Sequence, residues 1–131
     1  ASVWALLEDL SEIVDRVEAS NDPAFGTAGA KLRDALAALE RTSRWLLERL
    51  AAAPNDALAG ATPYLRLFSV TLGGCLLARQ ALAARGGGDG SRHVTLARFF
   101  AENVTVQADA LAAGIVDGAD AITGADAVLL A

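Results

Sequence analysis

The sequence predicts one all-α domain over residues 1–131: an antiparallel four-helix bundle in up-down-up-down order with a short helical C-terminal tail. Alanine and leucine, both strong helix formers, make up most of the 53% hydrophobic content. Apolar residues recur at three- and four-residue steps in four segments. Runs rich in Pro, Gly, Asn and Asp separate these segments, and a length of 131 residues suits a single domain.

The first helix is predicted over residues 3–18, and a turn at Ser-Asn-Asp-Pro follows it. The second helix is predicted over residues 22–53, with Thr27 as the alternative start. In the first helix, Leu10, Val14 and Val17 share one face and acidic residues fill the other. The second helix carries a near-heptad stripe of inward residues, which Trp45 and Leu47 widen. The members of this stripe are Leu32, Leu36, Leu39, Ser43, Leu46 and Leu50.

The third helix is predicted over residues 56–85. Pro63 allows two interpretations: a helix that starts there with Thr62 as its cap, or one kinked helix, which the spacing of the inward residues favours. Gly73 and Gly74 each cost a helix about 1 kcal/mol, so we expect a neighbouring backbone to pack closely there. A phosphate-binding loop is disfavoured because no strand precedes the pair and no Gly-Lys-Ser/Thr follows it. The inward residues are Leu58, Leu65, Phe68, Leu72, Cys75 and Leu76.

The fourth helix is predicted over residues 92–113, with Ser91 as its cap, after a flexible glycine-rich loop at residues 86–91. Its expected inward residues are Leu96, Phe99, Phe100, Val104, Gln107 and Leu111. Residues 114–131 are expected to form a tail of two short helical segments. The apolar tail residues expected to dock are Ile122, Val128, Leu129 and Leu130.

The chain holds few chemically active residues. His93 is the only histidine, so neither a histidine-based metal site nor a Ser-His-Asp triad can be built. A histidine phosphotransfer module is a rival interpretation, but His93 lies at a helix start rather than in the middle of a helix face. Cys75, the only cysteine, is expected to be a small buried hydrophobe. A lone cysteine also favours a reducing compartment, and we expect the cytoplasm.

The charge distribution limits the classes of partner. A net charge of −5 argues against nucleic acid. The uncharged run Leu67–Ala78 is too short for a membrane span, which needs about 20 apolar residues. Between the third and fourth helices we expect a partly buried ion pair that joins Arg79 to Glu102.

Three stretches of the sequence carry a family resemblance. ATPYLRLF at residues 61–68, followed by Gly73-Gly74 and by LLAR at 76–79, resembles the extra C-terminal domain of large bacterial acyl-CoA dehydrogenases. TSRWLL at 42–47 and ARFFAENV at 97–104 resemble the same domain.

The resemblance implies a parent flavoprotein that uses FAD to oxidise an acyl-CoA thioester to its 2-enoyl form. In that family the catalytic glutamate and the FAD and acyl-CoA contacts belong to upstream domains, so no catalytic, cofactor-binding or metal residue is assigned here. The chain lacks Met and starts at Ala1, and we expect a fragment that packs on the upstream dehydrogenase domains of a homo-oligomer. The alternative is a freestanding helical interaction module. The expected structural or interface residues are Tyr64, Arg66, Gly73, Gly74, Arg79, Arg98, Phe100 and Glu102.

Overall fold

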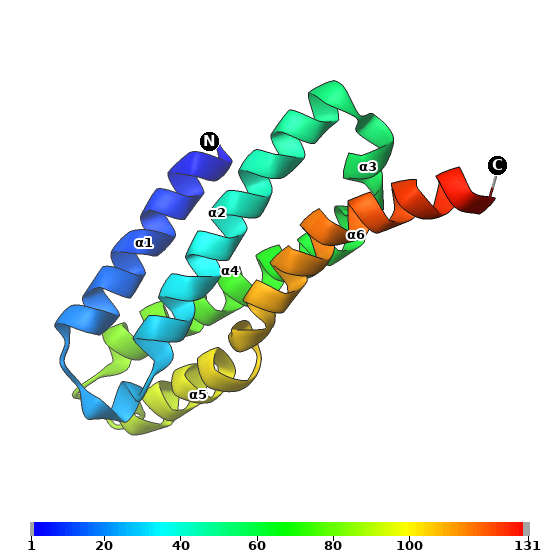
Figure 1. Cartoon of the computed structure of the whole chain (residues 1–131). Helices are drawn as coiled ribbons and strands as arrows, with labels where there is room; N and C mark the ends of the chain where they lie inside the picture. Colours follow the sequence, from blue (N-terminus) through cyan, green and yellow to red (C-terminus); the bar gives the residue numbers. More distant parts are fainter. Residues whose placement is uncertain (1, 130–131) are drawn as a thin grey trace.

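The computed structural model describes residues 2–129, and the side chains of all of these except residues 56 and 119–127. Over this range the chain is helical and contains no strand, so the prediction of an all-α fold is confirmed (Figure 1). The helices are α1 (Val3–Ala19), α2 (Ala28–Ala52), α3 (Pro54–Ala59), α4 (Ala61–Ala84), α5 (Gly90–Asn103) and α6 (Ala108–Leu129), with 3₁₀ turns η1 (Pro23–Phe25) and η2 (Thr105–Gln107). The predicted set of four helices is therefore not the observed one.

Helix α1 agrees with its predicted bounds to within one residue, and α2 begins next to the later of its two predicted starts. Ser2 caps α1, since its hydroxyl accepts a hydrogen bond from the Ala5 N–H at 3.2 Å. After α1, the Asp22 carboxylate accepts from the Ala24 N–H at 2.9 Å and opens η1. Phe25 is buried, and Gly26 has a positive φ of 56°, which ends the turn. Residues 22–27 thus form a turn that fills one end of the core. Of the two predicted starts of the second helix, Asp22 is wrong, and Thr27 directly precedes the observed start at Ala28.

The predicted third helix is divided at Gly60, not kinked at Pro63. Helix α3 begins at Pro54, and it ends where the Gly60 N–H donates a hydrogen bond to the Ala57 carbonyl at 3.2 Å. Pro63 lies in the first turn of α4, where a missing N–H breaks no helical hydrogen bond. Gly60 allows a close approach, because a methyl group placed on it would lie 3.0 Å from Cγ2 of Ile115 in α6.

The predicted fourth helix is divided as well, and the predicted tail is a continuous helix. Helix α5 begins at Gly90, earlier than the predicted loop allowed, and ends at Asn103. The buried Thr105 hydroxyl then donates to the Val70 carbonyl of α4 at 2.8 Å, which fixes the backbone in η2. Helix α6 follows without a break to Leu129. Val128 and Leu129 are exposed rather than docked, while Leu130 and the side chain of Ile122 lie outside the described parts of the chain.

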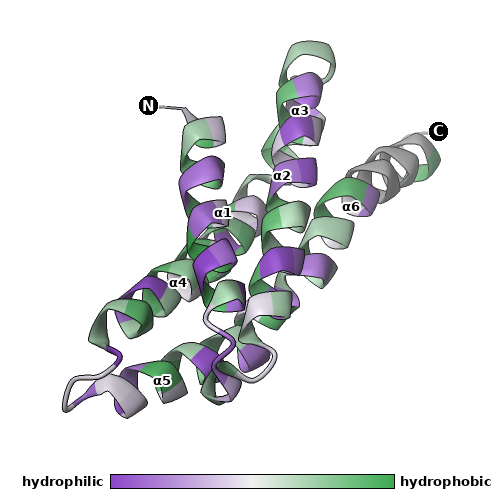
Figure 2. Cartoon of the chain, turned by 90° about the vertical axis from the view of Figure 1, so that its left-hand side faces the viewer, coloured by the Kyte–Doolittle hydropathy of each residue, from purple (hydrophilic) through white to green (hydrophobic). Residues whose placement is uncertain are grey.

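Helix α4 lies at the centre of the domain and contacts α1, α2, α5 and α6. Figure 1 shows α1 and α2 side by side and running in opposite directions, with α6 continuing beyond α5. Figure 2 shows hydrophilic residues recurring along α1 and α2, whose opposite sides supply the core. By length and composition alone α4 could cross a membrane, and a core helix of this kind passes the same test. The core side chains on α1, α2 and α4 include Leu10, Val14, Leu32, Leu39, Leu67, Val70 and Cys75.

Candidate functional site: an apolar groove at the open end

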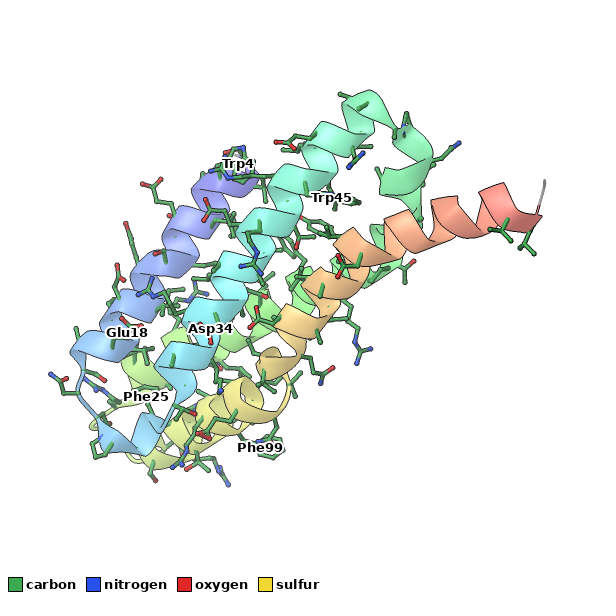
Figure 3. The ribbon with its side chains drawn as sticks, viewed as in Figure 1. Trp4, Glu18, Phe25, Asp34, Trp45 and Phe99 are labelled. Carbon is green, nitrogen blue, oxygen red and sulfur yellow. The ribbon has the colours of Figure 1, made fainter. Side chains whose placement is uncertain are left out.

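A groove forms because α2 extends beyond the start of α1. The Arg44 guanidinium lies 4.8 Å from the centroid of the Trp4 ring, so α1 begins at the level of Arg44 (Figure 3). The last two turns of α2 therefore extend beyond α1, and only Val3, the first residue of α1, reaches the groove. Helix α3 and the start of α4 fold back beside these turns and form the other wall. We call this region the open end.

The groove has a volume of about 380 Å³ and an almost wholly apolar lining. Its outer residues are strongly exposed: Leu47 by 51%, Leu50 by 53%, Leu58 by 68% and Leu65 by 65%. Exposed leucines that cluster in a hollow mark a site of interaction more often than leucines scattered singly. The lining consists of Val3, Ser43, Leu46, Leu47, Leu50, Ala57, Leu58, Ala61, Tyr64 and Leu65.

The groove overturns part of the predicted core. Leu47, Leu50, Leu58 and Leu65 were all expected to face inward, and all four are exposed. Their spacing along the helices was interpreted correctly as one apolar face. The error lies in the partner, because no described helix covers this face at the open end.

The polar groups of the groove are two hydroxyls that satisfy each other. Ser43 Oγ and the Tyr64 hydroxyl lie 2.7 Å apart. Ser43 is buried and Tyr64 half-buried, so the pair joins α2 to α4 at the base of the groove. Among the described side chains, the lining contains no carboxylate, imidazole, thiol, amine or guanidinium. It is suited to apolar contact, since general acid–base catalysis needs a titratable group poised near neutral pH.

The glycine pair lies away from the groove, in the packed interior. A methyl group on Gly74 would clash with Thr105 Oγ1 and lie 2.7 Å from Leu32 Cδ2. One on Gly73 would lie 3.2 Å from Cζ of Phe100, a half-buried ring of α5. Neighbours do pack closely against the pair, as expected, but they are side chains rather than a backbone.

The expected ion pair between Arg79 and Glu102 is wrong. Arg79 is exposed, while the Glu102 carboxylate accepts hydrogen bonds from Arg98 Nε at 3.1 Å and from the N–H and hydroxyl of Thr27 at 3.2 and 3.0 Å. The Thr27 and Arg98 hydrogen bonds hold the pKa of Glu102 below its usual range. The hydrogen bonds from Thr27 to Glu102 thus join the start of α2 to α5. The four-residue spacing of Arg98 and Glu102 was visible in the sequence, but the contact with Thr27 had no signal there.

The remaining candidates for chemistry are inert or isolated. Burial raises the pKa of the Cys75 thiol to about 12, so it stays protonated at neutral pH. His93 is half-buried in the first turns of α5, and Arg66 is exposed. Among the described side chains, no three His, Cys, Asp or Glu residues gather closely enough to hold a metal ion.

Comparison with known proteins gives one match. A family model described as "Acetyl-CoA dehydrogenase C-terminal like" matches residues 6–126, which include nearly the whole wall of the groove. No curated protein and no solved structure matches the chain.

Proposed function

The chain belongs to the acetyl-CoA dehydrogenase C-terminal-like family, and we propose that it is the C-terminal helical domain of an acyl-CoA dehydrogenase-like flavoprotein. The parent reaction is the FAD-dependent α,β-dehydrogenation of an acyl-CoA. This domain contributes no catalytic group and instead packs on the upstream dehydrogenase domains. We place the parent in the bacterial cytoplasm as a homo-oligomer that takes part in fatty acid metabolism.

The groove at the open end carries the proposal. Val3 begins α1 and lines the groove, so residues that precede this chain in the parent emerge at the groove's edge. Covering Leu47, Leu50, Leu58 and Leu65 would remove large apolar side chains from water, at about 25 cal/mol for each Å² buried. We infer that α1, α2, α4 and the α5–α6 pair are the four members of an antiparallel bundle that supports this surface.

The groove does not fit FAD. A flavin nucleotide needs hydrogen-bond donors for its ring and positive groups or free backbone N–H groups for its pyrophosphate. The lining offers one pair of hydroxyls already bonded to each other. We assign FAD to the upstream domains and derive no step through it here.

Hydrogen exchange tests the docking. The amides of α3 and the first turns of α4 should exchange more slowly in the full-length parent than in the isolated chain. Replacement of Leu58 and Leu65 together by glutamate should abolish this difference, because two carboxylates cannot be buried without partners. The matched control is Ala37→Glu, at an exposed position of α2 away from the groove. Equal exchange in parent and isolated chain would contradict docking at the groove.

Two simpler observations test the family role. The isolated chain should purify colourless, and flavin that copurifies with it in stoichiometric amount would show that the cofactor assignment is wrong. A flavoenzyme sequence encoded directly upstream of Ala1 would support the proposal. A start codon immediately before Ala1 would overturn it and favour a freestanding interaction module.

A further inference from the structure

A second exposed apolar surface lies where α4 packs on α5, on a different side of the domain from the groove. It consists of Leu76 on α4 and of Leu96 and Phe99 on α5, and we call it the α4–α5 face. Phe99 is 60% exposed, and its ring projects away from α5 (Figure 3). Leu76, Leu96 and Phe99 were all expected to face inward, so their exposure corrects that prediction.

The register of the two helices places these side chains together. Helices α4 and α5 run in opposite directions, and Phe100 packs on Gly73. Leu76, one turn after Gly73, therefore lies level with Leu96, one turn before Phe100. By the same register, Arg92 of α5 and Arg79 of α4, one turn after Leu76, lie at one end of the face, whereas Arg66 lies beyond its other end.

The charge around this face is opposite in sign to that of the whole chain. Residues 61–101 hold five of the eleven Lys and Arg residues but only one of the sixteen Asp and Glu residues, Asp89. Arg98 and Arg85 pair with Glu102 and Asp22. Arg66, Arg79 and Arg92 form no ion pair within the described part of the chain. The face therefore combines apolar side chains with arginines that can pair with an incoming carboxylate.

We propose that the α4–α5 face binds a partner protein through an amphipathic helix whose apolar stripe is flanked by carboxylates. Phe99 and Leu96 are the anchors, and Arg79 and Arg92 pair with the partner's Asp or Glu side chains. An aromatic ring beside arginines is the composition of protein interfaces, and arginine matches a carboxylate with two parallel hydrogen bonds. Three apolar side chains make a small contact, so the complex should be weak and sensitive to salt.

Charge disfavours the other occupants. Two copies that met symmetrically through this face would bring their arginines together. An anionic membrane surface requires about four to eight clustered Lys or Arg residues, and this face has two. The inference uses a different surface from the groove, so it does not depend on the proposed function.

A peptide titration tests the proposal. The full 131-residue chain, labelled with ¹⁵N, is titrated with a synthetic 18-residue helix that carries a Leu/Phe stripe flanked by glutamates. The matched control peptide has lysine at each glutamate. The acidic peptide should shift the amide resonances of residues 92–103 and those around Leu76, and binding should weaken as salt is added. Phe99→Ala should weaken binding about tenfold.

A charge swap gives the sharpest outcome. Arg79→Glu with Arg92→Glu should lose the acidic peptide and gain the lysine peptide, while Arg16→Glu on the exposed face of α1 should change neither. All three positions are exposed, so the fold should persist and can be checked by the amide spectrum. The proposal is overturned if both peptides bind equally, if the shifts map to the groove, or if neither peptide binds. It is also overturned if vesicles of phosphatidylcholine and phosphatidylglycerol shift the face and the acidic peptide does not.

Discussion

Leucine side chains are exposed at one end of the domain and buried at the other. At the open end, Leu58 and Leu65 lie largely in water. At the other end, which we call the closed end, η1 inserts Phe25 into the core and Glu102 fastens the start of α2 to α5. Leu32 and Leu39, which belong to the same predicted stripe as Leu50, are wholly buried there.

The difference between the ends comes from coverage and not from helix periodicity. The leucine stripe of α2 is continuous from Leu32 to Leu50, but α1 covers it only as far as the level of Arg44. Beyond that level the same apolar face is exposed to solvent. A stripe that satisfies helical spacing thus serves as core over one stretch and as a docking surface over the next.

The largest expected effect separates a leucine in the core from a leucine in the groove. Leu39→Ala should lower the free energy of unfolding of the isolated chain by about 2–5 kcal/mol, because it leaves a cavity in the core. Leu58→Ala should change it by less than about 0.5 kcal/mol, because its side chain is already in solvent. Urea denaturation followed by circular dichroism measures both, and similar losses would erase the distinction between the ends.

A smaller effect separates a crowded glycine from an open one. Gly74→Ala should destabilise the isolated chain by about 1–3 kcal/mol, because its methyl group would collide with Thr105 and Leu32. Gly114→Ala is the control, since no heavy atom lies within 4 Å of an added methyl group there. It should stabilise the chain by about 0.5–1 kcal/mol through helix propensity alone. Thermal unfolding of both variants decides the sign, and a stabilising Gly74→Ala would contradict the packing described around Thr105.

The sequence predicted the fold class, α1 and the close packing at Gly73 and Gly74, because local spacing and glycine cost are visible in one dimension. It did not predict the break at Gly60, which depends on the approach of Ile115 from a distant helix. The break after Asn103 depends likewise on a hydrogen bond from Thr105 to Val70, thirty-five residues away. Neither Gly60 nor Asn103 is a proline, the residue type that most clearly marks the end of a helix in a sequence.

Of the eight residues expected to be structural or to lie at an interface, only Tyr64 lines the groove, and the leucines of the groove were expected to lie in the core. Tyr64 was singled out, and the leucines of the groove were recognised as apolar stripes. The sequence did not show that α1 begins at the level of Arg44. Because α1 does not extend further, these leucines line a groove and are not part of the core. The hydroxyl pair of Ser43 and Tyr64 had a weak signal, a serine at an inward position among leucines. Its partner could only be identified in three dimensions.

The smallest expected effect concerns the fastening at the closed end and depends on pH. The pKa of Glu102 is held low in the folded chain by Thr27 and Arg98. A group whose folded pKa is depressed stabilises the fold above its unfolded pKa, and that contribution is lost as the pH falls through the folded pKa. Acidification should therefore loosen the contact between Thr27 and Glu102, and Glu102→Gln should reduce the dependence of Tm on pH in the acid range. Glu12→Gln, on the exposed face of α1, is the matched control and should leave this dependence as it is in the wild type. If Glu102→Gln loses as much Tm as the wild type between pH 6 and pH 3, the carboxylate does not fasten the closed end. The stability of the closed end would then depend on Phe25 and on the packing around Gly74.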